Sequence, residues 1–183
     1  THPNVVRRWW LHDKNMREAI RNPGVTFGVF TVRRISGILF MLLRLPSGRA
    51  IAYPHPQLDQ REPTQEEIEA MEEGKFYGPD RFIQVSYWGQ IPASMQWGRI
   101  RLWGSKSFEN EVQGTAADFM AHGAIVAEKR GMAPFMLVHD QGLALRTNGR
   151  TASDFEAALA ALPAWAKGFP MRVEAKITPY YRK

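Results

Sequence analysis

Two apolar runs separated by a four-residue polar turn restrict the fold of this chain more than any other feature. Residues 134–138 and 143–146 have the composition of strands, and residues 139–142 (His-Asp-Gln-Gly) lie between them. Apolar arms joined by a short turn that contains Asp and Gly are typical of a β-hairpin. Burial of both arms would hold the turn rigidly at the edge of a core, where it presents an imidazole, a carboxylate and an amide.

The carboxylate of Asp140 in this turn is suited to bind a divalent cation. Mg²⁺ prefers oxygen ligands in strict geometry, which a rigid turn at a sheet edge can supply. Asp and Gly are also ordinary turn residues. Taken alone, the segment favours a plain turn over a metal site.

Periodic patterns along the rest of the chain predict a mixture of helices and strands. Helices are predicted at residues 3–21, 66–73, 108–130 and 151–162, the second and fourth with capping boxes. Strands are predicted at residues 25–32, 38–45, 50–53, 81–88, 97–103 and 171–177. The chain is therefore expected to be α+β, with an antiparallel sheet packed against two or three helices.

The first predicted helix places its large apolar side chains on one face. These are Val6, Trp9, Trp10, Met16 and Ile20, which their spacing places together on one helical face.

Composition limits the classes of function. The 183 residues include 24 Lys and Arg against 18 Asp and Glu, a net charge of +6. This charge favours a polyanion such as nucleic acid, although a merely basic protein explains it as well. The absence of cysteine excludes disulfides, zinc-thiolate sites and cysteine nucleophiles.

The chain is not expected to have a membrane partner, and it shows no signal peptide. Its longest apolar run, residues 38–43, is too short to span a bilayer. The start at Thr1, without methionine, suggests a piece cut from a longer polypeptide.

Two further segments could contact nucleic acid. Asn110 and Gln113 are three residues apart on a predicted helix, so they share a face, and their amides could donate to minor-groove acceptors that every correct base pair carries. The alternative is a polar first turn followed by close helix packing. Arg49 follows a Pro-Ser-Gly turn and could bind phosphate, or could be a solvated arginine of a plain hairpin.

The order of these motifs along the chain resembles the C-terminal part of phage family A DNA polymerases. LPSGR at residues 45–49 is followed by QGTAAD at 113–118 and by VHD at 138–140. The QGTAAD segment is also similar to the matching helix of bacterial DNA polymerase I. The resemblance covers essentially the whole chain. It implies that residues 1–106 connect the fingers to the palm and that residues 107–183 form the palm core.

The resemblance also implies roles for individual residues. Asp140 would bind the catalytic magnesium ions, and His139 would lie near the primer 3′ end. Asn110 and Gln113 would contact the primer-template duplex, and Arg49 would lie near the DNA backbone. Gln141 stands where the family motif has glutamate, and it could still offer an oxygen to the metal.

The implied reaction is template-directed nucleotidyl transfer to a primer 3′-hydroxyl, assisted by two Mg²⁺ ions. The implied partners are primer-template DNA, deoxynucleoside triphosphates and an upstream polymerase segment, in a bacterial host cytoplasm. This chain lacks the first palm aspartate and the triphosphate-binding fingers helix. It should therefore be inactive alone, and its sheet should have an open edge that exposes apolar surface.

Two alternatives remain open at this point. The chain could be a polymerase-derived DNA-binding or structural module without catalysis. It could also be an unrelated basic α+β binding protein.

Overall fold

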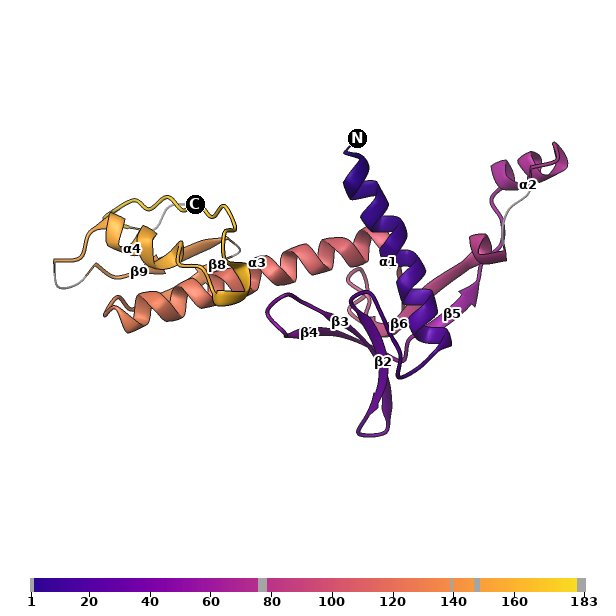
Figure 1. Cartoon of the computed structure of the whole chain (residues 1–183), viewed down its shortest axis with the longest axis horizontal. Coiled ribbons are helices and arrows are strands. Elements are labelled where there is room, and N and C mark those ends of the chain that lie inside the picture. Colours follow the sequence, from indigo (N-terminus) through magenta and orange to yellow (C-terminus); the bar gives the residue numbers. More distant parts are fainter. Residues whose placement is uncertain (1, 76–78, 139, 147–148, 181–183) are drawn as a thin grey trace. The chain divides into compact units, whose positions relative to one another are not determined.

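The computed structural model describes residues 2–75, 79–138, 140–146 and 149–180. These residues form four α-helices and three antiparallel sheets, so the α+β expectation is confirmed (Figure 1). The chain divides into two compact units, Thr1–Val112 and Gln113–Lys183. Our functional division at residue 106, which rests on the resemblance, stays a prediction.

Helix α1 (Pro3–Arg21) begins with proline in its first turn, where the missing N–H is not needed. Its buried residues are His12, Met16 and Ala19, which recur at helical spacing. The apolar face expected from the sequence is only partly buried, since Trp10 is 64% exposed. The helix packs through a stripe that includes a histidine, which an analysis of apolar residues alone overlooks.

Four strands of the first unit form a sheet in the order β1-β2-β3-β4. They are β1 (Thr26–Phe27), β2 (Phe30–Ile35), β3 (Ile38–Arg44) and β4 (Ala50–Pro54). The single strand predicted at 25–32 was wrong, because Gly28 adopts a φ of +58° and turns the chain between β1 and β2. The hairpin around residues 46–49 is confirmed by the pairing of Arg44 with Ala50. Phe30 and Met41 are buried in this sheet's core.

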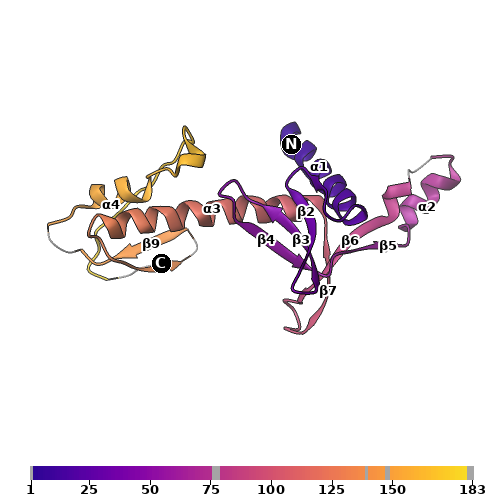
Figure 2. The ribbon, with the colours of Figure 1, turned by 60° about the horizontal axis from the view of Figure 1, so that its bottom comes forward.

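A second sheet of the first unit contains β5 (Gln57–Gln60), β6 (Ile83–Gln90) and β7 (Trp97–Leu102) in that order (Figure 2). A 3₁₀ turn, η1 (Pro79–Phe82), occupies the start of the strand predicted at 81–88. Val85 and Leu102 from this sheet join the hydrophobic core that also contains Met16 and Phe30.

Helix α2 (Gln65–Glu72) begins with the predicted capping box between Thr64 and Glu67. The Glu67 carboxylate accepts two hydrogen bonds of 2.8 Å from Arg61 and one of 2.7 Å from Arg81 Nε. The Arg61 guanidinium, together with the backbone N–H of Thr64, holds the pKa of Glu67 well below its usual range. Charge pairs therefore hold this segment in place.

Helix α3 (Gly104–Lys129) begins in the first unit and ends in the second. It starts four residues earlier than the predicted 108, and Gly131 follows its end with a φ of +78°. The second unit continues with β8 (Pro134–Val138), β9 (Gln141–Ala144), α4 (Ala152–Leu159) and the 3₁₀ turn η2 (Ala164–Ala166). Ala127, Met132 and Ala158 form its small core.

The end of the described chain differs from its prediction as a strand at 171–177. This segment has no strand pairing among the described residues. Val173 and Ala175 are half-buried while Glu174 and Lys176 are exposed, so the alternation is present. The Ala175 N–H donates instead to Glu156 Oε1 of α4, at 2.7 Å. Alternation predicted the extended backbone but could not reveal that its partner is a helix.

Helix α4 also ends earlier than the predicted residue 162. Its capping box between Thr151 and Asp154 is confirmed. Pro163 disfavours a helical conformation for the residue before it, and the helix ends at Leu159. Among the described helices, none has the length and apolar character needed to cross a membrane.

Candidate active site and nucleic-acid contacts

The β8–β9 hairpin carries Asp140 on a tight turn. Val138 pairs with Gln141, which leaves two residues between the strands. Asp140 is exposed, so its carboxylate is not buried in the core. His139 lies outside the described residues. Gln141 is the first residue of β9 rather than part of a four-residue turn, which corrects the predicted turn length.

The hairpin arms are less buried than the sequence suggested. Phe135 is 60% exposed, Leu137 47% and Leu145 66%. The expectation that both arms are buried was wrong, because β8 and β9 form a sheet of only two strands among the described residues. One side packs, with Gly142 facing Leu159 and Phe155 of α4. The other side shows the exposed apolar surface expected of a sheet with an open edge.

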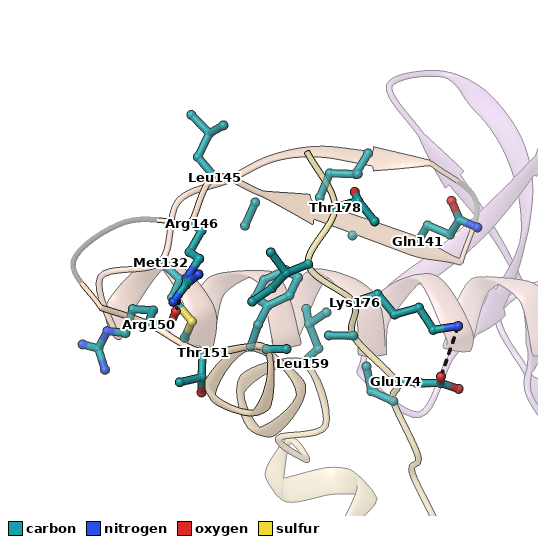
Figure 3. A pocket seen from close by; sticks show the side chains of 18 of the residues that line it. Met132, Gln141, Leu145, Arg146, Arg150, Thr151, Leu159, Glu174, Lys176 and Thr178 are labelled. Atoms are coloured by element: carbon teal, nitrogen blue, oxygen red, sulfur yellow. Dashed lines mark hydrogen bonds and ion pairs between the residues drawn. The ribbon is translucent and has the colours of Figure 1, made fainter. Parts of the chain in front are cut away.

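A cavity of about 640 Å³ lies in the second unit. It is lined by β9, α4 and the extended segment near residues 173–180 (Figure 3). Gln141 lies at one end of the view and Arg146 and Arg150 lie at the other. Asp140 also lines this cavity. The turn thus borders an open space in which its oxygen atoms can meet a ligand.

The metal-binding capacity of the described residues is limited. No three His, Asp or Glu side chains among them gather closely enough to hold a metal ion. The donors at the turn, a carboxylate and an amide oxygen, suit a hard cation such as Mg²⁺. One carboxylate does not hold two such ions, so a two-metal site at Asp140 would need ligands from outside the described part of the chain.

Asn110 is held by a buried tyrosine. Its Nδ2 donates to Tyr53 Oη at 2.9 Å, and Tyr53 is only 2% exposed. Burial raises the pKa of Tyr53 to about 12. Asn110 is half-buried and belongs to the first unit, whereas Gln113 is exposed and belongs to the second. The two amides share one helix, but one of them already serves an internal contact.

A cluster that the sequence analysis missed joins α1 to the start of α3. His12 Nδ1 lies 3.1 Å from Ser107 Oγ, and His12 Nε2 lies 2.9 Å from Glu111 Oε2. The imidazole also makes edge contacts with Phe30 and Phe108. A Ser-His-Glu set resembles a hydrolytic triad, but Ser107 is completely buried, so no substrate can reach its hydroxyl.

We interpret the His12 cluster as a positioning device for the α3 turn that carries Asn110. His12 lies 95 residues from Ser107 in the sequence, which hides this contact from local patterns. The available signal was the four-residue spacing between Ser107, which immediately precedes the predicted helix, and Glu111 within it.

Arg49 lies in the turn between β3 and β4, as predicted. Its backbone N–H donates to Ser47 Oγ at 3.3 Å, and its carbonyl accepts from the Leu45 N–H at 2.8 Å. Gly48 has a φ of +88°, which explains why glycine precedes the arginine. The Arg49 residue is exposed, and its role at a DNA backbone stays a prediction.

Because the Tyr53 hydroxyl is buried, we predict that the protein loses stability in alkali. Its pKa rises from the ordinary 10 to about 12 on folding, so the unfolded chain ionises first. The contribution of this hydroxyl is fully present below pH 10 and is lost as pH rises toward 12. A change of two in pKa corresponds to about 3 kcal/mol. Between pH 9 and pH 12, the free energy of unfolding in urea should therefore fall for the wild type relative to Tyr53→Phe by up to about 3 kcal/mol. A pH-independent difference would contradict this.

Comparison with known proteins found a phage relative. The chain is 33% identical over 149 residues to a DNA polymerase of Bacillus phage SP02. The match covers 81% of this chain but 20% of that polymerase, so the chain spans about one fifth of its relative. No family model matches the chain, and no solved structure matches it either. The chain is therefore related to part of a phage DNA polymerase.

Proposed function

We propose that this chain is the C-terminal palm part of a family A DNA-directed DNA polymerase. The similarity to the SP02 phage polymerase over most of the chain carries the proposal. The exposed carboxylate of Asp140 on the tight β8–β9 turn supports it, because a polymerase needs a rigid carboxylate that metal and substrate can reach.

Asp140 would bind the catalytic Mg²⁺ ions, with the Gln141 amide oxygen as a weaker neighbouring ligand. His139 would lie beside the primer terminus. The bound Mg²⁺ supplies charge neutralisation for the displacement of pyrophosphate from a deoxynucleoside triphosphate by the primer 3′-hydroxyl. The protein's own contribution is to hold the carboxylate in place before the reaction, so that little reorganisation is needed.

The remaining ligands would come from an upstream part of the polymerase. Asp140 supplies one carboxylate, and a second carboxylate from that part would complete the two-metal site. Asn110, Gln113 and Arg49 would contact primer-template DNA. Asn110 would do so while its Nδ2 stays bonded to Tyr53, which fixes the direction of the amide.

Primer extension by a chimera tests this function. The matched segment of the SP02 polymerase is replaced by residues of this chain, and the isolated chain is assayed in parallel. We expect template-directed synthesis from the chimera and none from the isolated chain. Duplex binding without synthesis by a folded chimera would instead indicate a DNA-binding module. Absence of both in a folded chimera would contradict the proposed function.

A further inference from the structure

The sheet formed by β5, β6 and β7 (Figure 2) has one face in the core, and its opposite face is buried at Ser86 but exposed at Trp88, Trp97 and Arg101. Val85 pairs with Leu102, and both are buried, so this pair marks the core face. The neighbouring pairs point to the opposite side, because side chains alternate along a strand. That side carries three cross-strand pairs: Ser86 with Arg101, Trp88 with Arg99, and Gln90 with Trp97.

Two tryptophans on the exposed face are open to solvent. Trp88 is 41% exposed and Trp97 is 68% exposed. They stand on adjacent strands one diagonal apart, since Trp88 pairs with Arg99 and Trp97 lies two residues before it. Diagonal neighbours are roughly 7–8 Å apart. Neither indole is needed to fill the core on the other side of the sheet.

The first arginine of this face holds Trp88 in place. The Arg99 guanidinium lies over the Trp88 ring, 5.9 Å from its centroid. Arg99 Nη1 also donates to the His55 carbonyl at 2.6 Å, and Nη2 donates to Gln57 Oε1. The cation and the ring are therefore fixed together, and little side-chain freedom remains to be lost when a ligand binds.

The charge of this face is positive. Arg99 and Arg101 both project from β7, and Arg101 has no hydrogen-bond or ion-pair partner among the described residues. The three strands contain one acidic residue, Asp59. It is half-buried and accepts a hydrogen bond from Gln57 Nε2. Exposed rings beside unopposed cations fit a ligand that offers both flat apolar faces and negative charge.

We propose that this face, defined by Trp88, Trp97, Arg99 and Arg101, binds single-stranded nucleic acid. Bases stack on the two indoles and Arg101 binds the phosphate between them. Arg99, whose Nη1 and Nη2 already donate to His55 and Gln57, contributes its positive charge. The two tryptophan positions, roughly 7–8 Å apart as diagonal neighbours on adjacent strands, are farther apart than the rise of about 3.4 Å in a stacked strand. We therefore expect each ring to take a separate, unstacked base, which a duplex does not offer. A purely apolar protein partner would not use the unopposed Arg101.

This inference stands apart from the proposed catalytic function. It involves neither Asp140 nor a metal ion, and all its residues belong to the first unit. In a polymerase, such a face would hold unpaired template. Oligonucleotide binding that persists in EDTA and in the Asp140→Asn variant does not depend on the catalytic metal site. The binding assay therefore tests this face independently of the proposed function.

Fluorescence anisotropy with a labelled oligothymidine and the full chain, in EDTA and low salt, tests the proposal. Trp97→Ala and Trp88→Ala should each weaken binding about tenfold or more, whereas Trp97→Phe should retain most of the affinity because it keeps a ring. Trp10→Ala is the matched control, since Trp10 is 64% exposed on α1, and it should bind like the wild type. Arg101→Gln should reduce the slope of log affinity against log salt by about 0.7.

Several outcomes would overturn the proposal. One is equal binding by the wild type and the Trp88→Ala/Trp97→Ala double variant, both with unchanged thermal unfolding. Another is a loss with Trp10→Ala as large as that with Trp97→Ala. A third is a blunt duplex of the same length whose binding falls with the Trp88→Ala/Trp97→Ala double variant as much as the binding of the oligothymidine does. Self-association through Trp97 without oligonucleotide binding would assign this face to a second copy of the chain instead.

Discussion

Asp140→Asn is expected to reduce nucleotide incorporation by the chimeric polymerase about a thousandfold or more. Asparagine keeps the shape of the side chain but loses the negative charge that holds a divalent cation. Catalytic metal ions contribute several kcal/mol to transition-state stabilisation, and each 1.36 kcal/mol corresponds to a factor of ten in rate. Gln141, an uncharged neighbour, cannot replace that charge.

The substitution should leave folding unchanged, because Asp140 is exposed on a two-residue turn. Surface changes away from special contacts usually alter the free energy of unfolding by no more than about 0.5 kcal/mol. Glu128→Gln is the matched control: it removes an exposed carboxylate of α3 in the same unit. It should leave both the rate and the thermal unfolding near those of the wild type.

Gly104→Ala is expected to produce a large loss of stability in the first unit. A Cβ at this position would lie 2.0 Å from the Trp9 carbonyl oxygen and 2.9 Å from Asp13 Cβ. The first contact is with backbone, so α1 would have to move away from α3. Overpacking of this kind costs about 1–3 kcal/mol and occasionally more, and we expect about 3 kcal/mol or above. The displacement would also separate His12 from Ser107.

Urea unfolding followed by tryptophan fluorescence measures this effect. Ser105→Ala is the control at the next position of α3. Because alanine is the best helix former, a large loss with Gly104→Ala alone identifies the close approach to Trp9 as the cause. A Gly104→Ala protein within about 0.5 kcal/mol of the wild type, the range of ordinary surface changes, would show that the two helices do not approach this closely.

Local signals predicted the helix and hairpin boundaries that depend on neighbouring residues. The capping boxes at Thr64 and Thr151 lie where the sequence placed them, because each is completed by a residue three positions later. Long-range contacts were not predictable in this way. The start of α3 at Gly104 depends on the backbone of Trp9, and the burial of His12 depends on Ser107.

In the candidate site, too, local features were predictable from the sequence and long-range contacts were not. The hairpin and the exposed Asp140 follow from apolar arms and turn residues close in sequence. The expected burial of Phe135 and Leu137 was wrong, because burial depends on a further strand or partner that the sequence of the arms does not reveal. The exposed face of Trp88 and Trp97 was missed for a similar reason. Only the register of β6 and β7 shows that both rings lie on one side.

Single-turnover primer extension by the chimera, at saturating Mg²⁺, tests most directly whether Asp140 is a catalytic carboxylate. We predict synthesis by the chimera and by its Glu128→Gln variant at similar rates, with a loss of about a thousandfold or more for Asp140→Asn. Extension at an undiminished rate by a folded Asp140→Asn chimera would contradict the assignment of this turn to the polymerase site.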